Sequence, residues 1–250
     1  RASPSIPPRA RRLAAGRARP PRAPGGGPGP QGLRLGPVSA AQPNPVYRAS
    51  WHLARFLLRL LFHYRVEGAE KVPAEGPVIL AANHLSILDP IVVGAGIRRP
   101  VSFMARADVF RLPFLSWLLP RLYAIPVERG SGDLSAVKGA IRALERGMAF
   151  GIFPEGTRSR TGKLQPFKTG VAAIALRTGS PVVPVAVVGT EEAWPVGKKL
   201  FRPCRPVRVI YGDPIPVPRK SKVSHRELEA LTREIEARVR DLLPPRYWGS

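Results

Sequence analysis

The sequence predicts the α/β fold class: a layered sheet flanked by helices, with one further helix ahead of it that suits an interface. Three observations predict it. Short apolar runs alternate with longer segments in which apolar residues recur every three or four positions. Gly147 and Gly179 follow two of those longer segments, as glycines that end helices do. Residues 1–44, by contrast, are rich in Arg, Pro and Gly and contain no acidic residue, so we expect a disordered tail there.

Residues 45–66 form the predicted interfacial helix, and residues 67–250 the folded domain behind it. Basic side chains recur in this helix at spacings of three and four, at Arg48, His52, Arg55, Arg59 and His63. The rest of the helix is mostly Trp, Leu and Phe, which predicts an amphipathic helix lying in the surface of an anionic bilayer. The alternative is the same helix docked on the protein's own core, with its Arg side chains facing water.

The other elements follow in order along the domain. Strands are predicted at 77–82, 101–105, 148–153, 181–189 and 206–211. Helices are predicted at 90–97, 133–146, 171–179 and 225–243, the last beginning with a capping box of Ser224 and Glu227. The segment 111–120 is apolar and bounded by Pro, which makes it a second candidate for lipid contact. Strands that alternate with helices indicate a largely parallel or mixed sheet.

The stretch AANHLSILDP, residues 81–90, places His84 five positions before Asp89 at the end of a predicted strand. Neither a continuous helix nor a strand brings side chains at that spacing together. Asn83 and Ser86 favour a turn, and Pro90 suits the first turn of a helix. A strand, a turn and a helix start would let the Asp carboxylate orient the imidazole as a proton acceptor.

A second polar group follows the strand that ends near residue 153. The segment FPEGTRSRTGKLQPFKTG contains a Gly turn, which we expect to lift Glu155, Arg158 and its other charged side chains out of the sheet edge. Arg129 follows a further apolar segment, in IPVER. Ligands bind at such strand ends in open α/β sheets, and a guanidinium suits a phosphate.

Four segments together resemble the glycerolipid acyltransferase family, whose members include the 1-acyl-sn-glycerol-3-phosphate acyltransferases. They are NHLSILD at 83–89, IPVER at 125–129, FPEGTRSR at 153–160 and VVPVAVVGT at 182–190. They look like the four ordered motifs of that family, and the likeness spans about residues 60 to 215. Arg106 stands where relatives usually have Lys, and Glu128 where they often have Asp.

This resemblance implies a role for each matching residue. His84 resembles the general base, and Asp89 the carboxylate that orients it. Arg129 and Arg158 resemble ligands of the substrate phosphate. Glu155, Gly156 and Thr157 resemble the turn that shapes the same pocket.

The activity implied is transfer of a fatty acyl group from a thioester to the free hydroxyl of 1-acyl-glycerol 3-phosphate, which gives phosphatidic acid. The donor would be acyl-CoA or acyl carrier protein, with no cofactor. Glycerol 3-phosphate or another lysophospholipid remains open as the acceptor, and so does a non-catalytic membrane-binding relative. The expected location is the cytoplasmic face of the cell membrane, with peripheral or monotopic attachment.

Composition agrees with these partners. The formal net charge of the 250 residues is +23, which indicates an anionic partner. The aromatic residues cluster with Leu in stretches that suit lipid, instead of alternating with Lys and Arg, so nucleic acid is not expected as that partner. The four histidines and the single Cys204 do not cluster with acidic residues, so no metal site is predicted.

Overall fold

A computed structural model describes residues 43–128 and 134–249 of the chain. The predicted tail, except its last two residues, and Arg129 therefore lie outside the described residues. The strands are β1 (Arg65–Glu67), β2 (Val78–Ala82), β3 (Val101–Arg106), β4 (Ile125–Val127), β5 (Ala149–Ile152), β6 (Val182–Val188) and β7 (Arg208–Tyr211). The α-helices are α1 (Pro45–Phe62), α2 (Asp89–Gly96), α3 (Pro113–Arg121), α4 (Leu134–Glu145), α5 (Gly170–Thr178), α6 (Thr190–Ala193) and α7 (His225–Leu242). Short 3-10 helices are η1 (Ala69–Lys71), η2 (Ala107–Arg111) and η3 (Pro245–Tyr247).

The seven strands form one sheet in the order β1-β7-β6-β2-β5-β3-β4. Neighbours are parallel except β6 and β7, which run antiparallel. Every residue of β2 and β6 is buried, as expected for central strands covered on both faces. The carboxyl ends of β2, β5 and β6 therefore meet at one edge, and the polar segments predicted from the sequence follow two of them.

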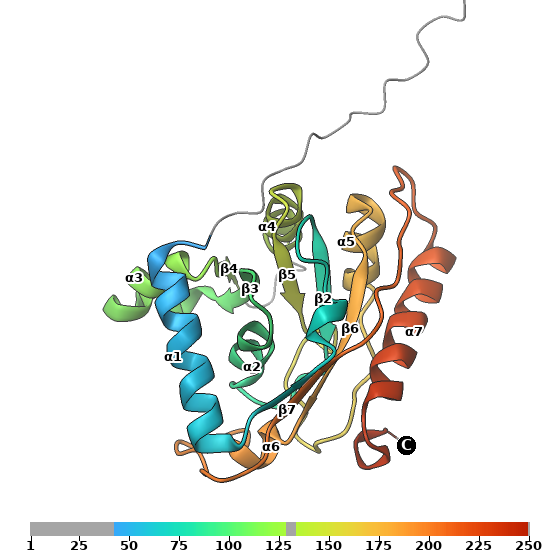
Figure 1. Ribbon diagram of the computed structural model, residues 1–250. Helices are drawn as coiled ribbons and strands as arrows, with labels where there is room; N and C mark the ends of the chain where they lie inside the picture. Colours follow the sequence, from blue (N-terminus) through green and yellow to red (C-terminus); the bar gives the residue numbers. More distant parts are fainter. Residues whose placement is uncertain (1–42, 129–133, 250) are drawn as a thin grey trace, which may run out of the picture. The chain divides into compact units, whose positions relative to one another are not determined.

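Helices cover both faces of this sheet (Figure 1). On one face α1 and α2 pack against residues such as Leu80, Val183 and Val209. On the other face α4, α5 and α7 pack against Ile79, Phe150 and Ala186. Alternate residues of β2 thus serve opposite cores, as the two-residue period of a strand requires. The α/β layered fold predicted from the sequence is confirmed.

Helix α1 is docked on the domain, and its contacts differ from those expected. Trp51 Nε1 donates to the carbonyl oxygen of Ile97 at 2.7 Å, and Leu58 and Phe62 are buried. Arg55 was expected in the basic stripe, but its Nη1 donates to the Ala95 carbonyl at 2.9 Å and its guanidinium lies over the Trp51 ring. An Arg beside α2 satisfies the unpaired carbonyls at the end of that helix, which explains why it leaves the stripe.

The helix also ends earlier than the predicted residue 66. His63 adopts a left-handed conformation, with φ 46°, and β1 begins at Arg65. The strand formed because residues 65–67 pair with β7, far away in sequence. None of the helices in the described part of the chain is long and apolar enough to cross a membrane.

Candidate active site

Strand β2 ends at Ala82, and six residues carry the chain across the sheet edge to α2. The side chain of Asn83 closes the strand end: Nδ2 donates to the Val187 carbonyl at 2.9 Å, and Oδ1 accepts the Val187 N–H at 2.7 Å. The amide takes the place of one main-chain pairing, so the chain can turn away while β6 stays satisfied. Asp89 and Pro90 then begin α2, where the missing proline N–H costs nothing.

Asp89 is fully buried and accepts four hydrogen bonds. Its Oδ2 accepts the main-chain N–H groups of Leu85 at 2.6 Å and Ser86 at 2.8 Å, and also meets His84 Nδ1 at 2.8 Å. Its Oδ1 accepts the Thr190 hydroxyl at 2.6 Å. Four donors satisfy the lone pairs of a carboxylate, which is the condition for burying one at tolerable cost.

The His84 ring is fixed by this carboxylate and keeps one nitrogen for chemistry. The carboxylate accepts at Nδ1, so the neutral ring carries its proton there and Nε2 keeps its lone pair. Within residues 43–128 and 134–249, Nε2 has no hydrogen-bond partner. The side chain is 18% exposed, so Nε2 can accept a proton from a group that arrives from solvent.

The turn after β5 holds His84 from the other side. Ser159 N–H donates to the His84 carbonyl at 2.7 Å, and Glu155 Oε1 accepts the His84 N–H at 2.8 Å. The Phe153 ring stacks on the imidazole, with centroids 4.1 Å apart and planes at 19°. One turn therefore contacts the N–H, the carbonyl and the ring of His84.

Glu155 does not point out of the sheet edge, as the sequence had suggested, but is only 4% exposed. It turns inward because the His84 N–H has left the β-ladder and needs an acceptor. Burial raises the pKa of Glu155 to about 8, against the opposite effect of the His84 and Gln165 N–H groups. Its Oε2 is buried with no hydrogen-bond partner among the described residues.

The remaining predicted ligands lie on the outer side of this turn. Gly156, Thr157 and Arg158 are exposed. Gly156 has φ 75°, and a Cβ there would lie 2.7 Å from Lys168 Nζ, so Lys168 crosses the turn at this point. Arg158 and Lys168 are thus two of the four cationic side chains on the segment predicted to meet a phosphate, while the proposed second ligand, Arg129, is outside the described residues.

Thr190 is the site residue whose contact sequence reasoning missed. The segment 182–190 was identified as one of the four family-like motifs, with no contact assigned to Thr190, whereas Thr190 bonds directly to Asp89. Nearby, the Ser86 hydroxyl donates to the Trp194 carbonyl at 2.8 Å. A hydroxyl residue directly after Gly189, at the end of a buried strand next to β2, was the available signal.

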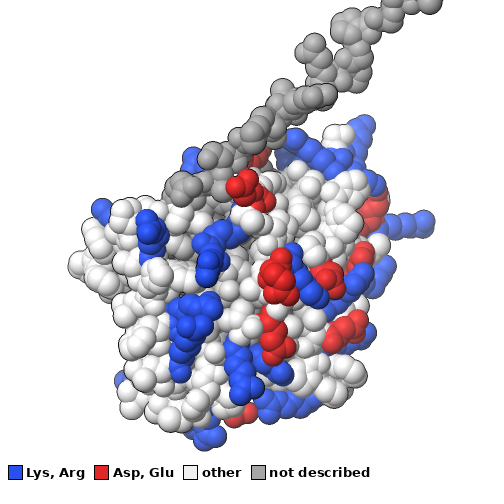
Figure 2. All heavy atoms as spheres, viewed as in Figure 1, with Lys and Arg blue, Asp and Glu red and all other residues white. Residues whose placement is uncertain are grey.

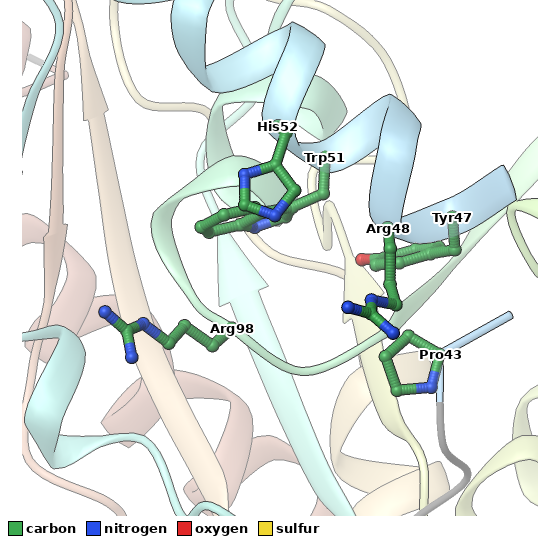
Figure 3. A pocket seen from close by; sticks show the side chains of 6 residues that line it. All are labelled: Pro43, Tyr47, Arg48, Trp51, His52 and Arg98. Atoms are coloured by element: carbon green, nitrogen blue, oxygen red, sulfur yellow. The ribbon is translucent and has the colours of Figure 1, made fainter. Parts of the chain in front are cut away.

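Two cavities lie along α1, away from this pair. One, of about 390 Å³, is lined by Tyr47, Trp51 and basic side chains of α1 together with Arg98 (Figure 3). The other, of about 560 Å³, lies between Arg55, Arg98 and η1. Arg98 follows the end of α2, whereas Asp89 begins it, so these hollows belong to the opposite end of that helix. Neither is lined by His84 or Asp89.

The described residues contain no group of three His, Cys, Asp or Glu side chains that could hold a metal ion. What they do assemble is a carboxylate, an imidazole with a free nitrogen, and a cationic turn. This arrangement can take a proton from a hydroxyl and hold an anionic group close to it.

Comparisons with known proteins cover the same region. Residues 63–188 match the family model described as Acyltransferase. The chain is similar to the 1-acyl-sn-glycerol-3-phosphate acyltransferase of Bacillus subtilis, with 29% identity over 199 residues, which covers 79% of this chain and 96% of that one. It is 32% identical over 153 residues to a chloroplastic 1-acyl-sn-glycerol-3-phosphate acyltransferase of Brassica napus, covering 60% of this chain and 44% of that one. The chain spans about half the length of the Brassica napus protein and of a chloroplastic 1-acyl-sn-glycerol-3-phosphate acyltransferase of Arabidopsis thaliana.

The fold is also similar to the crystal structure of the 1-acyl-sn-glycerophosphate (LPA) acyltransferase PlsC from Thermotoga maritima. The TM-score is 0.66 and the identity 30%, and the likeness covers 78% of this chain and 79% of that chain. The residues 63–188 that match the family model include β2, the His84–Asp89 turn, the β5 turn and β6.

Proposed function

The chain belongs to the acyltransferase family, and we propose that it moves a fatty acyl group from a thioester donor to the free hydroxyl of 1-acyl-glycerol 3-phosphate, which gives phosphatidic acid. The observation that supports this most is the 2.8 Å contact of His84 Nδ1 with Asp89, which leaves Nε2 as an acceptor at a strand end. The names of the Bacillus and Thermotoga relatives support the acceptor.

The geometry supports one route for the proton. The acceptor hydroxyl gives its proton to His84 Nε2 as its oxygen attacks the thioester carbon. The new ester bond forms, the carbon–sulfur bond breaks, and the proton passes from the imidazolium to the leaving thiolate. Asp89 stabilises the imidazolium between these steps, because its carboxylate lies at the opposite ring nitrogen.

The substrate phosphate is placed in this proposal on the outer side of the β5 turn. Arg158 is exposed there, six residues after Ile152, the last residue of β5, and on the same turn that contacts His84. An Arg guanidinium can grip two phosphate oxygens at once. The phosphate would then be fixed relative to the base by the turn itself.

An apolar surface close to the His84–Asp89 pair, here called the dyad, is available to the acyl chain and to a membrane. Ile87, inside the turn between His84 and Asp89, is 55% exposed, and Ile91 on α2 is 47% exposed. Helix α1 exposes Leu53, Phe56 and Leu60, and α3 exposes Phe114 and Trp117. Exposed large apolar side chains mark interaction surfaces, and we propose that these serve the interface of a bilayer.

Basic side chains accompany that apolar surface. Arg48, His52 and Arg59 of α1 are exposed, and Figure 2 shows Lys and Arg gathered over the part of the surface that α1 occupies, beside a broad area with no charged side chain. Lipid headgroups of negative charge would meet the first set, and acyl chains the second. We therefore propose peripheral attachment to the cytoplasmic face of the cell membrane.

The experiment is an acyl-transfer assay with a panel of acceptors: 1-acyl-glycerol 3-phosphate, glycerol 3-phosphate and a lysophospholipid with a larger headgroup. Each is offered acyl-CoA and acyl carrier protein thioester as donors. We expect the first acceptor to give the highest kcat/KM, and His84→Ala to remove about 10²- to 10⁴-fold of the rate.

Three results would change the proposal. A higher kcat/KM with another acceptor would move the substrate assignment to that compound. Transfer by His84→Ala at the rate of the parent would remove the chemical mechanism altogether. Turnover by neither donor with any acceptor would favour a membrane-binding relative without activity.

A further inference from the structure

The carboxyl-terminal residues 245–248, here called the C-terminal strap, lie outside the region matched by the family model. Tyr247 in this strap is 2% exposed. Its hydroxyl accepts the Gly189 N–H at 3.0 Å and Arg246 Nη2 at 2.9 Å, and it donates to Glu191 Oε1 at 2.6 Å. One donor and two acceptor positions are the full capacity of a hydroxyl group.

The strap also binds the long loop that continues from the β5 turn. The Leu164 N–H donates to the Tyr247 carbonyl at 2.8 Å, and Lys163 Nζ donates to the Arg246 carbonyl at 2.7 Å. The same residues therefore tie down two segments, the loop after β5 and the start of α6. Figure 1 shows the end of the chain, after α7, beside the lower end of the sheet where these segments lie.

Those two segments are the ones that hold the dyad. The first contacts His84 through Glu155, Ser159 and Phe153. The second carries Thr190, which bonds to Asp89 and stands between Gly189 and Glu191, the two residues that the Tyr247 hydroxyl grips. Hydrogen bonds from Tyr247 to Gly189 and Glu191, the peptide bonds that join these two residues to Thr190, and the hydrogen bond from Thr190 thus link Tyr247 to Asp89 and His84.

We propose that Tyr247 is a positioning residue for the His84–Asp89 pair and acts on it through Thr190. This inference rests on the proposed function for its rate measurements, but its spectroscopic test does not. Gly189 explains why a strap is needed. It has φ 87°, and a Cβ there would lie 2.1 Å from the Pro206 carbonyl oxygen, so position 189 has no side chain that could hold the turn and its N–H is held by Tyr247 instead.

The test compares two variants, each of which loses the hydroxyl group of one tyrosine. In Tyr247→Phe the Gly189 N–H loses its acceptor; in Tyr47→Phe the Val101 N–H loses one, at the far end of the sheet. We expect kcat of Tyr247→Phe to fall about 10-fold, with KM changed less than about twofold, because small displacements of a catalytic base are costly in rate. Tyr47→Phe should keep the parent's kcat. Circular dichroism and thermal unfolding establish that both variants are folded at the assay temperature.

A double-mutant cycle tests the route through Thr190. Thr190→Val should lower kcat, and Thr190→Ser, which keeps the hydroxyl, should restore most of it. In the Thr190→Val background, Tyr247→Phe should cost less than about twofold more, since residues in one network are not additive. An unchanged, fully additive effect of Tyr247→Phe would show that it does not act through Thr190, and a change confined to KM would show that it does not position the base.

Proton NMR gives a readout that needs no turnover. The His84 Nδ1–H bonded to Asp89 should give a downfield resonance, identified by its loss in His84→Ala. We expect that signal to shift or broaden in Tyr247→Phe and to stay in place in Tyr47→Phe. An unchanged signal in a folded Tyr247→Phe variant overturns the inference, even if the proposed acceptor proves wrong. A change in this signal without acyl transfer by the parent would support the inference and count only against the proposed function.

Discussion

Asp89 organises the residues around it more than His84 does, because its carboxylate accepts three hydrogen bonds from residues 84–86 of its own turn and one from α6. Its two oxygens differ. Oδ2 faces the N–H groups of Leu85 and Ser86 together with the imidazole, and Oδ1 faces only the Thr190 hydroxyl. A hydroxyl can donate or accept, so the Oδ1 side tolerates a donor that the Oδ2 side does not.

Asp89→Asn should therefore keep the fold and lose the rate. The amide NH₂ can turn toward Thr190, and its oxygen can serve the three other donors. The charge that stabilises the imidazolium is absent, and we expect kcat to fall about 10²-fold or more. Asp89→Ala, as a comparison, leaves the N–H groups without an acceptor and should also lower the free energy of unfolding, by about 1 to 3 kcal/mol. Near-parental kcat in Asp89→Asn would exclude the dyad.

Glu155 makes stability depend on pH. Its pKa is about 8 in the folded protein, against 4.5 for the ordinary carboxyl, and burial is the cause. Above pH 4.5 the unfolded chain gives up this proton while the folded protein keeps it. The contribution of the protonated Glu155 to the free energy of unfolding is thus fully present below pH 4.5. It is lost as the pH rises toward 8, at up to about 1.4 kcal/mol for each pH unit.

Glu155→Gln should abolish that loss, since a glutamine can still accept the His84 N–H and does not ionise. In denaturant unfolding at pH 5 and pH 8.5, the free energy of unfolding of the variant relative to that of the parent should be higher at pH 8.5. The exposed Glu145→Gln serves as the control and should show the same difference at both pH values. If Glu155→Gln behaves like this control, the buried carboxyl is ionised in the native protein.

The dyad was predictable at this scale, and its supports were not. A His and an Asp five residues apart at a strand end require a turn, and turn residues stand between them. The contacts of Glu155 and Thr190 with that turn cross 71 and 101 positions of sequence. They depend on β5 and β6 lying on either side of β2, which local sequence does not specify.

At the scale of elements, α1 shows two apolar sides. Tyr47, Leu58 and Phe62 pack on the domain. Leu53, Phe56 and Leu60 face outward, and their exposed fractions are 58%, 62% and 62%. At 100° per residue the two sets lie on opposite sides of the helix. The two interpretations of this helix as membrane-bound or as docked are thus compatible, since different sides serve them.

Replacing Leu53 and Leu60 by Ser should release the protein from vesicles without unfolding it. Each leucine withdrawn from an apolar environment loses about 1.5 to 3 kcal/mol, whereas in water these side chains are already exposed. Flotation with anionic vesicles measures the loss, and acyl transfer to a detergent-dispersed acceptor should be retained. Leu200→Ser, at an 80% exposed position outside the helix, is the control. Equal flotation of parent and double variant would move the membrane contact to α3.

Most elements were predicted within two residues, because their apolar periods and caps are local. The capping box of Ser224 and Glu227 is present, and Gly179 ends α5 in the left-handed conformation. The three-residue strand β1 and the four-residue helix α6 were missed. Segments this short have no period to recognise and exist through their tertiary partners.

For the whole molecule, the dominant quantity is the charge of +23. We expect binding to anionic vesicles to weaken between 0.05 and 0.5 M salt and to persist in part, since screening acts on the charges and leaves the apolar contact intact. Neutral vesicles should show only the salt-independent part. Arg48→Gln with Arg59→Gln tests the charges on α1, because Arg55 takes part in the fold. Salt-independent binding of the parent would refute an electrostatic contribution.

The alternation of apolar strands and helices predicted a largely parallel or mixed sheet, but not the strand order. That order depends on pairings such as Val66 with Val209, which no local pattern encodes. The antiparallel direction of β7 next to β6 likewise follows from the route of the chain after α6.

The pairing of β1 with β7 also sets an order of events during synthesis. Strand β1 is synthesised before β7, its pairing partner, which follows about 140 residues later in the sequence. Pairing between strands so far apart in sequence slows folding. Helix α1 precedes even β1 and is complete long before the domain can cover its docking side. A nascent chain would therefore present both apolar sides of α1 while Asp89 still lacks Thr190, so that capture by a bilayer can precede catalytic competence.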